Sequence, residues 1–387
     1  MRSALNVLVV FCAGLGAAAQ FGKISILFDD LSAQYAGQGP VAMGWMVSIV
    51  GLVGLIFGVV AGVLISTFGP RRAIVAALFI AALVSGVEAI LPPYTVMMGL
   101  RVLEGVSHLA IVVAGPVLMA RAATPGTLGL VMALWGSFFG LSFAGLSAVA
   151  PSVVTFGGLG AVFVAHAAWM ATCAAVLWSV LPPDAASSPV RKIGLAARHL
   201  AIYASPRLAA PGLAFFCYTI IFVALLTLLP AEIPKPQRAI VAFWMPLAAI
   251  IVSLTVGVWI LRYLTAVQTV QLGFLLATFA AVALWAFWGQ GWLMTSAALS
   301  LSGAYGLVQG ASFAAIAQLN PTADGRAMAA GALAQMGNLG TVTGTPLLAY
   351  LMARGDAGAM LGFILPFCLG GIAIHVLQSA RRARILT

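Results

Sequence analysis

Hydrophobic residues run through this chain in blocks of about 20, and short polar turns separate the blocks. A block of that length crosses the hydrocarbon core of a bilayer as an α-helix, whereas the strands of a membrane barrel alternate hydrophobic and polar positions over shorter segments. The pattern therefore predicts an all-α membrane protein with twelve transmembrane helices. The expected spans are residues 4–28, 41–66, 73–91, 94–120, 128–150, 157–181, 208–230, 239–262, 267–288, 291–318, 326–352 and 357–378.

The composition indicates the same class. Only 7% of the 387 residues are charged and 63% are hydrophobic, which leaves too few charges to cover the surface of a soluble protein. The four cysteines fall inside apolar blocks without the spacing of metal ligands, so no metal or other cofactor is expected. The sequence contains no recognisable phosphate-binding loop and no nucleophile–base pair. The chain is therefore not expected to be an enzyme.

The net charge of +10 is distributed as a topology signal and not as a nucleic-acid surface. With both termini placed in the cytoplasm, Lys235, Arg238 and Arg354 fall outside, and Lys23 and Arg101 lie within the membrane. The other basic residues all fall inside: Arg2, Arg71, Arg72, Arg121, Arg191, Lys192, Arg198, Arg207, Arg262, Arg326, Arg381, Arg382 and Arg384. This bias predicts a multi-pass protein of the bacterial inner membrane with cytoplasmic termini.

The two halves of the chain share short sequence matches. Phe11-Cys12 matches Phe216-Cys217 (217 − 12 = 205), and Glu104-Gly105 matches Gln309-Gly310 (310 − 105 = 205). A shared offset, with six spans on each side, predicts a parallel repeat and two pseudo-symmetric bundles. The expected domains are an N-terminal six-helix bundle at 1–181, a cytoplasmic linker at 182–207 and a C-terminal six-helix bundle at 208–387.

The linker begins with a polar, proline-containing stretch and continues into a basic segment. Arg191, Lys192 and Arg198 are interleaved there with apolar residues such as Ile202 and Tyr203. This arrangement predicts a short amphipathic helix that lies on an anionic membrane surface.

Two local motifs accompany the twelve-span pattern. Arg101-x-x-Glu104-Gly105 stands in the fourth span, and Gly-x-Leu at 62–64 precedes Gly-Pro-Arg-Arg at 69–72 between the second and third spans. Together with the span count and the central linker, they resemble the major facilitator superfamily (MFS) over the whole chain. The resemblance implies a cytoplasmic gate loop, in which Ser66-Thr67 replaces the family's usual Asp-Arg. Its expected residues are Gly62, Gly69, Arg71 and Arg72.

A finer resemblance rests on three short runs. These are Gln20-x-Gly22-Lys23 in the first span, the motif at 101–105, and Leu-Trp-Gly at 134–136 in the fifth span. They are similar to bacterial facilitators of the cyanate-permease-like group.

The fourth span is almost wholly apolar but carries Arg101, Glu104 and His108. The spacings of 3 and 4 place all three on one face of a helix. A charged side chain in hydrocarbon costs several kcal/mol, so ionisable residues at such positions usually belong to a substrate or proton pathway.

The resemblance implies that the first, fourth, seventh and tenth helices line a central cavity. The helical rise places Lys23 and the Arg101–Glu104 pair at similar depths in the outer half of the membrane, with Gln20 on the same face as Lys23. We expect Lys23, Arg101 and Glu104 to form a cluster with one excess positive charge. A small anion would neutralise that charge, and Glu104 would be the proton-coupling group.

Alternatives remain open for these residues. Glu104 pairs with Lys23 or Arg101 either for transport or only to hold two helices together, because buried charges are paired in both cases. His108 either relays protons or forms a structural hydrogen bond inside the bundle.

The second half of the chain offers uncharged polar groups within its expected spans. They predict a C-terminal cavity wall that supplies hydrogen bonds and shape, although helix packing explains the amides of the eleventh span equally well. With Gln20, Lys23, Arg101 and His108, the expected substrate-binding residues are Tyr218, Tyr305, Gln309, Gln335 and Asn338.

These patterns favour a monomeric secondary transporter that works by alternating access in the lipid bilayer. The predicted substrate is a small organic anion or zwitterionic metabolite, coupled to protons. One alternative is efflux of lipophilic drugs by proton antiport. Another is a non-transporting membrane receptor or assembly factor built on a transporter scaffold.

Overall fold

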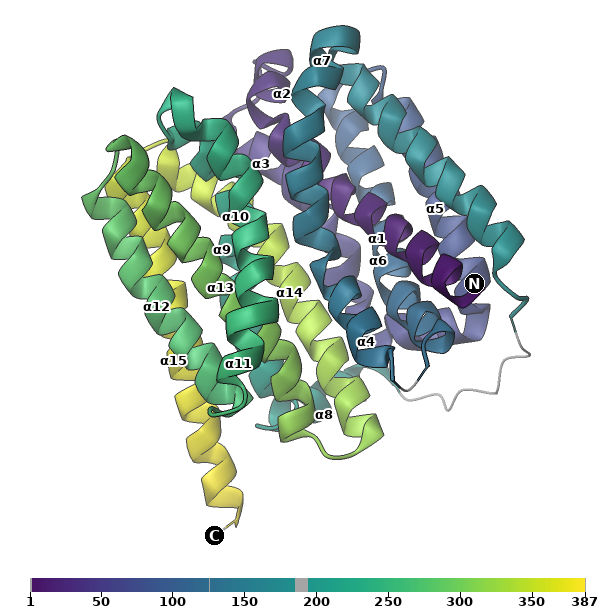
Figure 1. Ribbon diagram of the computed structural model, residues 1–387, viewed down its shortest axis with the longest axis vertical. Coiled ribbons are helices and arrows are strands. Elements are labelled where there is room, and N and C mark those ends of the chain that lie inside the picture. Colours follow the sequence, from purple (N-terminus) through teal and green to yellow (C-terminus); the bar gives the residue numbers. More distant parts are fainter. Residues whose placement is uncertain (1, 125, 185–193, 387) are drawn as a thin grey trace. The chain divides into compact units, whose positions relative to one another are not determined.

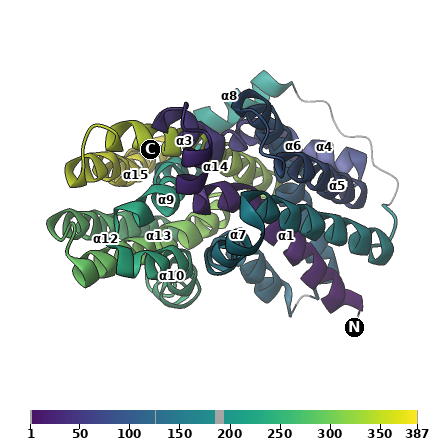
Figure 2. The same cartoon turned by 90° about the horizontal axis from the view of Figure 1, so that it is seen from above.

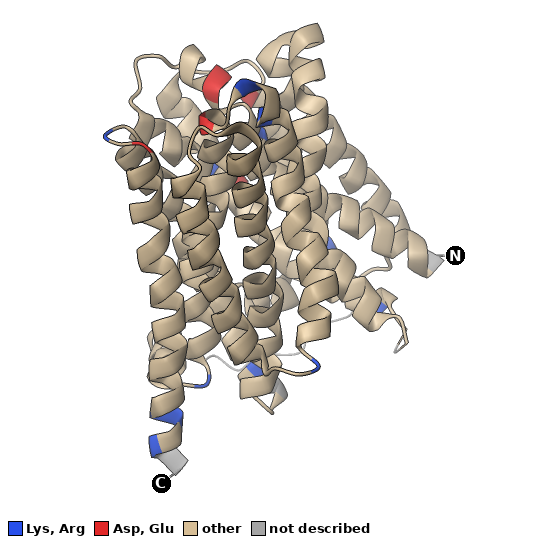
Figure 3. Cartoon of the chain, turned by 60° about the vertical axis from the view of Figure 1, so that its left-hand side comes forward, with Lys and Arg blue, Asp and Glu red and all other residues tan. Residues whose placement is uncertain are grey.

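The computed structural model describes residues 2–124, 126–184 and 194–386. Within these ranges the chain forms helices and turns and no strand, so the predicted all-α class is confirmed. Most of each helical ribbon carries neither acidic nor basic side chains (Figure 3). Ten helices are long and apolar enough to cross a membrane, among the residues that the structure describes.

Contacts divide the chain into two compact units. Unit 1 comprises residues 1–38 and 49–192, and unit 2 comprises residues 39–48 and 193–387. The helices of unit 1 are α1 (Arg2–Ile26), α2 (Phe28–Gln34), α4 (Gly51–Phe68), α5 (Pro70–Glu88), α6 (Tyr94–Ala122) and α7 (Leu128–Val180).

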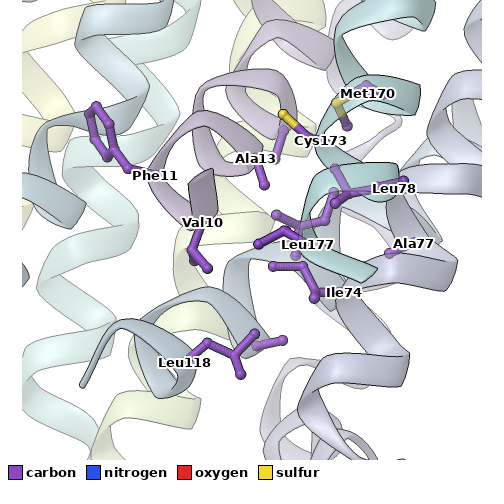
Figure 4. Packing of buried hydrophobic residues seen from close by; sticks show 14 of the residues in the cluster. Val10, Phe11, Ala13, Ile74, Ala77, Leu78, Leu118, Met170, Cys173 and Leu177 are labelled. Carbon is purple, nitrogen blue, oxygen red and sulfur yellow. The ribbon is translucent and has the colours of Figure 1, made fainter. Parts of the chain in front are cut away.

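Within unit 1, α1 packs against α6 and α7, and α5 packs against the same two helices (Figures 1 and 2). Small and aliphatic side chains fill the space between them, among them Ala13, Ala77, Leu78 and Leu177, all at most 3% exposed (Figure 4). Alanine and glycine let the helix backbones approach closely, which is typical of helix contacts in membranes. This packing fixes α1, α5 and α6, the three helices that carry the buried charges.

Unit 2 contains the remaining helices. They are α3 (Pro40–Ser48), α8 (Leu195–Ala204), α9 (Ala209–Glu232), the 3₁₀ turn η1 (Lys235–Gln237), α10 (Arg238–Val252), the π-helical turn η2 (Ser253–Gly257), α11 (Val258–Ile260), α12 (Ala266–Ala286), α13 (Gly291–Leu319), α14 (Ala323–Met352) and α15 (Ala357–Leu386). Contacts join α9 to α13, α14 and α15, and α12 to α13 and α15.

The boundaries differ from the sequence prediction at two places. The fifth and sixth expected spans are joined in α7, where Gly158 has non-helical backbone angles (φ 73°). The predicted break at Gly157-Gly158 is therefore present, but residues 151–156, expected as a connection, are helical. A proline at 151 did not end the helix, because the apolar run continues through it.

The second expected span is broken in the structure. It divides at 49–50 into α3 and α4, and α3 packs on α14 within unit 2. Gly44 permits this packing, since a Cβ atom at that position would lie 2.7 Å from the Cα atom of Pro346. The expected span at 41–66 is nonetheless present as one membrane-length stretch, Pro40–Phe68, and only its turn at 49–50 was not predicted, because the contact with α14 depends on tertiary packing and not on local sequence.

Candidate functional site

Four charged side chains meet in the interior of unit 1. Lys23 comes from α1, Glu88 is the last residue of α5, and Arg101 and Glu104 come from α6. All four side chains are 0% exposed. Among the residues that the structure describes, they are the only buried Lys, Arg, Asp or Glu side chains.

The Lys23 ammonium is surrounded by three acceptors. Its Nζ lies 2.5 Å from Glu88 Oε2, 2.6 Å from Glu104 Oε1 and 3.0 Å from the hydroxyl of Ser85. An ammonium has three N–H donors, so each of them has an acceptor here. The predicted contact between Lys23 and Glu104 is confirmed, and in this arrangement Lys23 has no donor left over for a substrate.

The Arg101 guanidinium lies on the other side of the Glu104 carboxylate. Its NH1 group donates to Glu104 Oε2, and its NH2 group donates to the carbonyl of Gln20 at 2.6 Å. Both oxygens of Glu104 therefore accept charge-assisted hydrogen bonds, one from each cation. The predicted grouping of Lys23, Arg101 and Glu104 is present.

Glu88 changes the charge of the predicted cluster. Two carboxylates face two cations, so the cluster is neutral when all four groups are ionised. The expected single excess positive charge is wrong, because the sequence reasoning left out Glu88. The sequence does contain a feature that points to Glu88: it is one of only eight acidic residues and stands at the end of an apolar stretch. An acid at the end of a span is normally interpreted as interfacial.

Two histidines border the cluster. His166 of α7 lies with Nε2 3.0 Å from the carbonyl of Gly16 and Nδ1 2.9 Å from the Ser85 hydroxyl. A proton on Nε2 fits these partners, because a carbonyl only accepts, and it leaves Nδ1 as an acceptor 3.5 Å from Lys23. His166 was not among the residues predicted for the site, yet it contacts the cluster directly.

The other two predicted residues of this wall are also buried. Gln20 donates from Nε2 to the hydroxyl of Ser107 at 2.6 Å, while its Oε1 has no hydrogen-bond partner among the described residues. His108 Nδ1 lies 3.0 Å from the carbonyl of Ala17, and its ring meets that of Phe21 edge-on at 5.0 Å. Gln20 and His108 therefore line the side of the cluster that extends along α1.

The predicted residues of unit 2 lie on α9, α13 and α14. Tyr305 and Tyr218 are buried with their ring centroids 5.8 Å apart, and the Tyr305 hydroxyl lies 3.4 Å from Cys368 Sγ. Asn338 donates to the carbonyl of Ala334, within its own helix, at 2.8 Å. Gln309 is half-buried on α13.

Gln335 binds the amphipathic helix of the linker. Its Oε1 accepts from the Tyr203 hydroxyl at 2.7 Å, and its Nε2 lies 3.0 Å from His199 Nε2. Burial raises the pKa of Tyr203 to about 12, so this hydroxyl stays protonated and donates at neutral pH. The predicted helix is present as α8, whereas Arg191 and Lys192 lie outside the described residues.

The gate loop is hydrogen-bonded to an aspartate that lies outside the motif. Asp184, just after α7, accepts the backbone N–H groups of Arg71 and Arg72, each at 3.0 Å. It thus caps the first turn of α5, where N–H groups lack helical partners. Gly69 precedes that turn with φ 98°, a conformation that favours glycine, and the exposed Gly62 lies a turn before the end of α4.

The Arg71 side chain has partners of its own. Its NH2 group donates to the carbonyl of Trp178 at 2.5 Å, and its guanidinium lies 4.3 Å from the centroid of that indole ring. Ser66 and Thr67 stand where the family usually has Asp-Arg. Both of their hydroxyls donate to the carbonyl of Val63. The loop is therefore anchored to the end of α7 through Asp184 and Trp178.

Comparisons with known proteins place these features in context. The family model described as Major Facilitator Superfamily matches residues 7–345. A solved structure of a bacterial homologue of the human lysosomal transporter Spinster, in an inward-facing and unoccupied conformation, superposes with a TM-score of 0.70. The alignment covers 98% of this chain and 96% of that one at 12% sequence identity, so the likeness concerns the fold. No curated protein sequence matches this chain significantly.

Proposed function

Because the chain belongs to the Major Facilitator Superfamily of secondary transporters, we propose that it carries a small organic anion or zwitterionic metabolite by alternating access, coupled to protons. The observation that carries the proposal is the buried, charge-balanced cluster of Lys23, Glu88, Arg101 and Glu104 in unit 1. The protein works in the bacterial inner membrane as a monomer, with both termini in the cytoplasm.

The charge balance supplies the coupling. With all four groups ionised the cluster is neutral, and every Lys23 donor is occupied. One proton on either carboxylate leaves an excess positive charge and weakens one of the ion pairs of Lys23 or Arg101. A substrate carboxylate then binds in place of the neutralised one. Proton binding and anion binding therefore favour each other, which is the linkage that cotransport requires.

A purely structural role explains the cluster less well. Well-packed hydrophobic residues often hold helices together as well as a buried ion pair does, because burying charges has a large desolvation cost. Two pairs at 0% exposure, with two histidines beside them, are more typical of a proton or substrate pathway.

Flux into liposomes tests the proposal. The purified chain is reconstituted, and uptake of a charge-graded panel of labelled monocarboxylates, amino acids and lipophilic cations is followed under a pH gradient with the interior alkaline. We expect accumulation of one of the anionic or zwitterionic compounds, abolished by a protonophore. Accumulation of lipophilic cations alone, under the reversed gradient with an acidic interior that drives proton antiport, indicates drug efflux instead. Binding of a compound without any flux indicates a receptor, and either outcome refutes the proposal.

A further inference from the structure

The two carboxylates of the cluster are held unequally. Glu104 accepts from Lys23 on one oxygen and from Arg101 on the other. Glu88 accepts only on Oε2, from Lys23, while its Oε1 is buried without a hydrogen bond and lies 3.8 Å from NH1 of Arg101. A buried charged oxygen without a donor is unfavourable, so Glu88 is the carboxylate that the site stabilises less in its ionised form.

The helix that carries each residue adds to this difference. Glu88 is the last residue of α5, at the end of the helix where the aligned peptide dipoles give a partial negative charge. That field disfavours a carboxylate. Glu104 lies inside α6, away from either end, and has no such neighbour.

Of the two carboxylates, Glu88 is the one closer in sequence to an exposed turn. The turn at 89–93 follows it directly, and Ile90 in this turn is 77% exposed. The Tyr35 hydroxyl donates to the carbonyl of Pro92 at 2.8 Å, and burial, together with the charge of Glu88, raises the pKa of Tyr35. Glu88 is therefore followed directly by a turn with an exposed residue, and Tyr35 is bonded to that turn.

We propose that Glu88 is the carboxylate that takes up and releases the coupled proton, and that Glu104 is the permanent counter-ion of Lys23 and Arg101. This assignment rests on the proposed function and differs from the sequence-based hypothesis, which placed the proton on Glu104. A proton from water bonds to Oε1 of Glu88, and the cluster changes from neutral to one excess positive charge. Release returns the same proton to water and restores the ion pair with Lys23.

The groups around Glu88 allow this step. Lys23 faces it from α1, Arg101 and Glu104 from α6, while His166 of α7 contacts Lys23 and Tyr35 lies on the side of the turn. Protonating Glu88 leaves Glu104 bonded to both cations, so neither Lys23 nor Arg101 becomes an unpaired buried charge. Protonating Glu104 instead weakens its ion pairs with both Lys23 and Arg101.

Infrared spectroscopy of the full chain in liposomes tests the assignment without a substrate. The carbonyl stretching band of a protonated carboxyl, identified by its shift in heavy water, is followed during a pH titration around neutrality. We expect this band in the parent protein and in Asp29→Asn, which changes an exposed carboxyl of α2. We expect it to be absent in Glu88→Gln, whose amide mimics the protonated side chain. Gel filtration confirms that each variant is folded.

Each outcome decides between the two proposals. A titrating band that persists in Glu88→Gln overturns the assignment to Glu88, and its loss in Glu104→Gln then returns the proton to Glu104 while proton coupling stands. The result for Glu88→Gln is decisive even where Glu104→Gln fails to fold. A parent protein without any titrating carboxyl band contradicts proton coupling by the cluster itself.

Discussion

The interiors of the two units differ in the kind of polar group they bury. Unit 1 encloses two cations and two carboxylates at 0% exposure. Unit 2 encloses, among its described residues, only neutral side chains such as Tyr218, Tyr305 and Gln335 or the histidine at 375. The Tyr305 hydroxyl, for example, lies beside the uncharged Cys368 thiol.

This difference indicates a division of labour. Neutral amides and hydroxyls supply hydrogen bonds. They do not bind and release a proton with a change of charge near neutral pH. All four charged groups of the cluster, by contrast, belong to unit 1. The proposed proton-linked step is therefore placed in unit 1, and the predictions below test that asymmetry.

The largest expected effect is on folding. Glu104→Ala removes the partner of both Lys23 and Arg101, and breaking a buried pair costs about 3–5 kcal/mol. The free energy of unfolding in detergent, from denaturant titration, measures it. Asp30→Asn, at an exposed aspartate of α2, is the control and should change stability far less. Equal effects of the two substitutions would mean that the cluster is not ionised in the folded protein.

The reverse change tests unit 2. Leu301 of α13 is 0% exposed, and Leu301→Glu places an acid where no cation is buried. We expect a loss of about 3 kcal/mol, in line with the cost of a charge at the centre of a membrane helix. Leu301→Met is the matched control. A stable Leu301→Glu protein would show that unit 2 accommodates a buried charge and would remove the contrast between the units.

A smaller effect is expected at the edge of unit 1. Asp184→Ala removes the acceptor for the N–H groups of Arg71 and Arg72, and loss of a helix cap costs about 1 kcal/mol. Faster amide exchange at the first turn of α5, measured by mass spectrometry, reports it. Asp184→Asn keeps an oxygen acceptor and should restore most of the protection. Unchanged exchange in Asp184→Ala would refute the capping role.

The smallest effect is expected for a neutral pair. Tyr305→Phe removes the hydroxyl beside Cys368 Sγ and should cost about 0.5–1.5 kcal/mol, the net value of an ordinary hydrogen bond. Thermal unfolding followed by the fluorescence of a thiol dye at the buried cysteines provides the measurement. A loss as large as that of Glu104→Ala would contradict the view that unit 2 contains only weak polar contacts.

The charged residues of the first and fourth spans show how far sequence reasoning reaches. The i, i+3 spacing of Arg101 and Glu104, with Lys23 at a similar depth, predicts the cluster because charges in an apolar helix need partners. The sequence analysis did not predict Glu88 as a member of the cluster, because only tertiary packing brings the end of α5 beside α1. His166 was not predicted either, because one histidine on an apolar helix face is usually a packed core residue.

The amides show the opposite limit. Gln335 carries the same polar signal as a substrate-binding residue, yet it binds Tyr203 and His199 of α8. Hydrophobic periodicity predicts that α8 exists, but not which helix its polar face contacts. Matching the two sequence halves is limited in a similar way. The helices α6 and α13 begin 197 residues apart (291 − 94 = 197). If the two helices are aligned by their first residues, Glu104 corresponds to Leu301 and not to Gln309.

The asymmetry is tested most directly by comparing accumulation with exchange in two variants. Once the liposome panel has identified a transported compound, Glu88→Gln and the unit 2 variant Tyr305→Phe are assayed for uptake driven by a pH gradient and for counterflow of labelled against unlabelled compound. The account predicts that Glu88→Gln keeps counterflow but loses pH-driven accumulation, whereas Tyr305→Phe keeps both. Accumulation by Glu88→Gln at the parent level, with proton dependence intact, would contradict it.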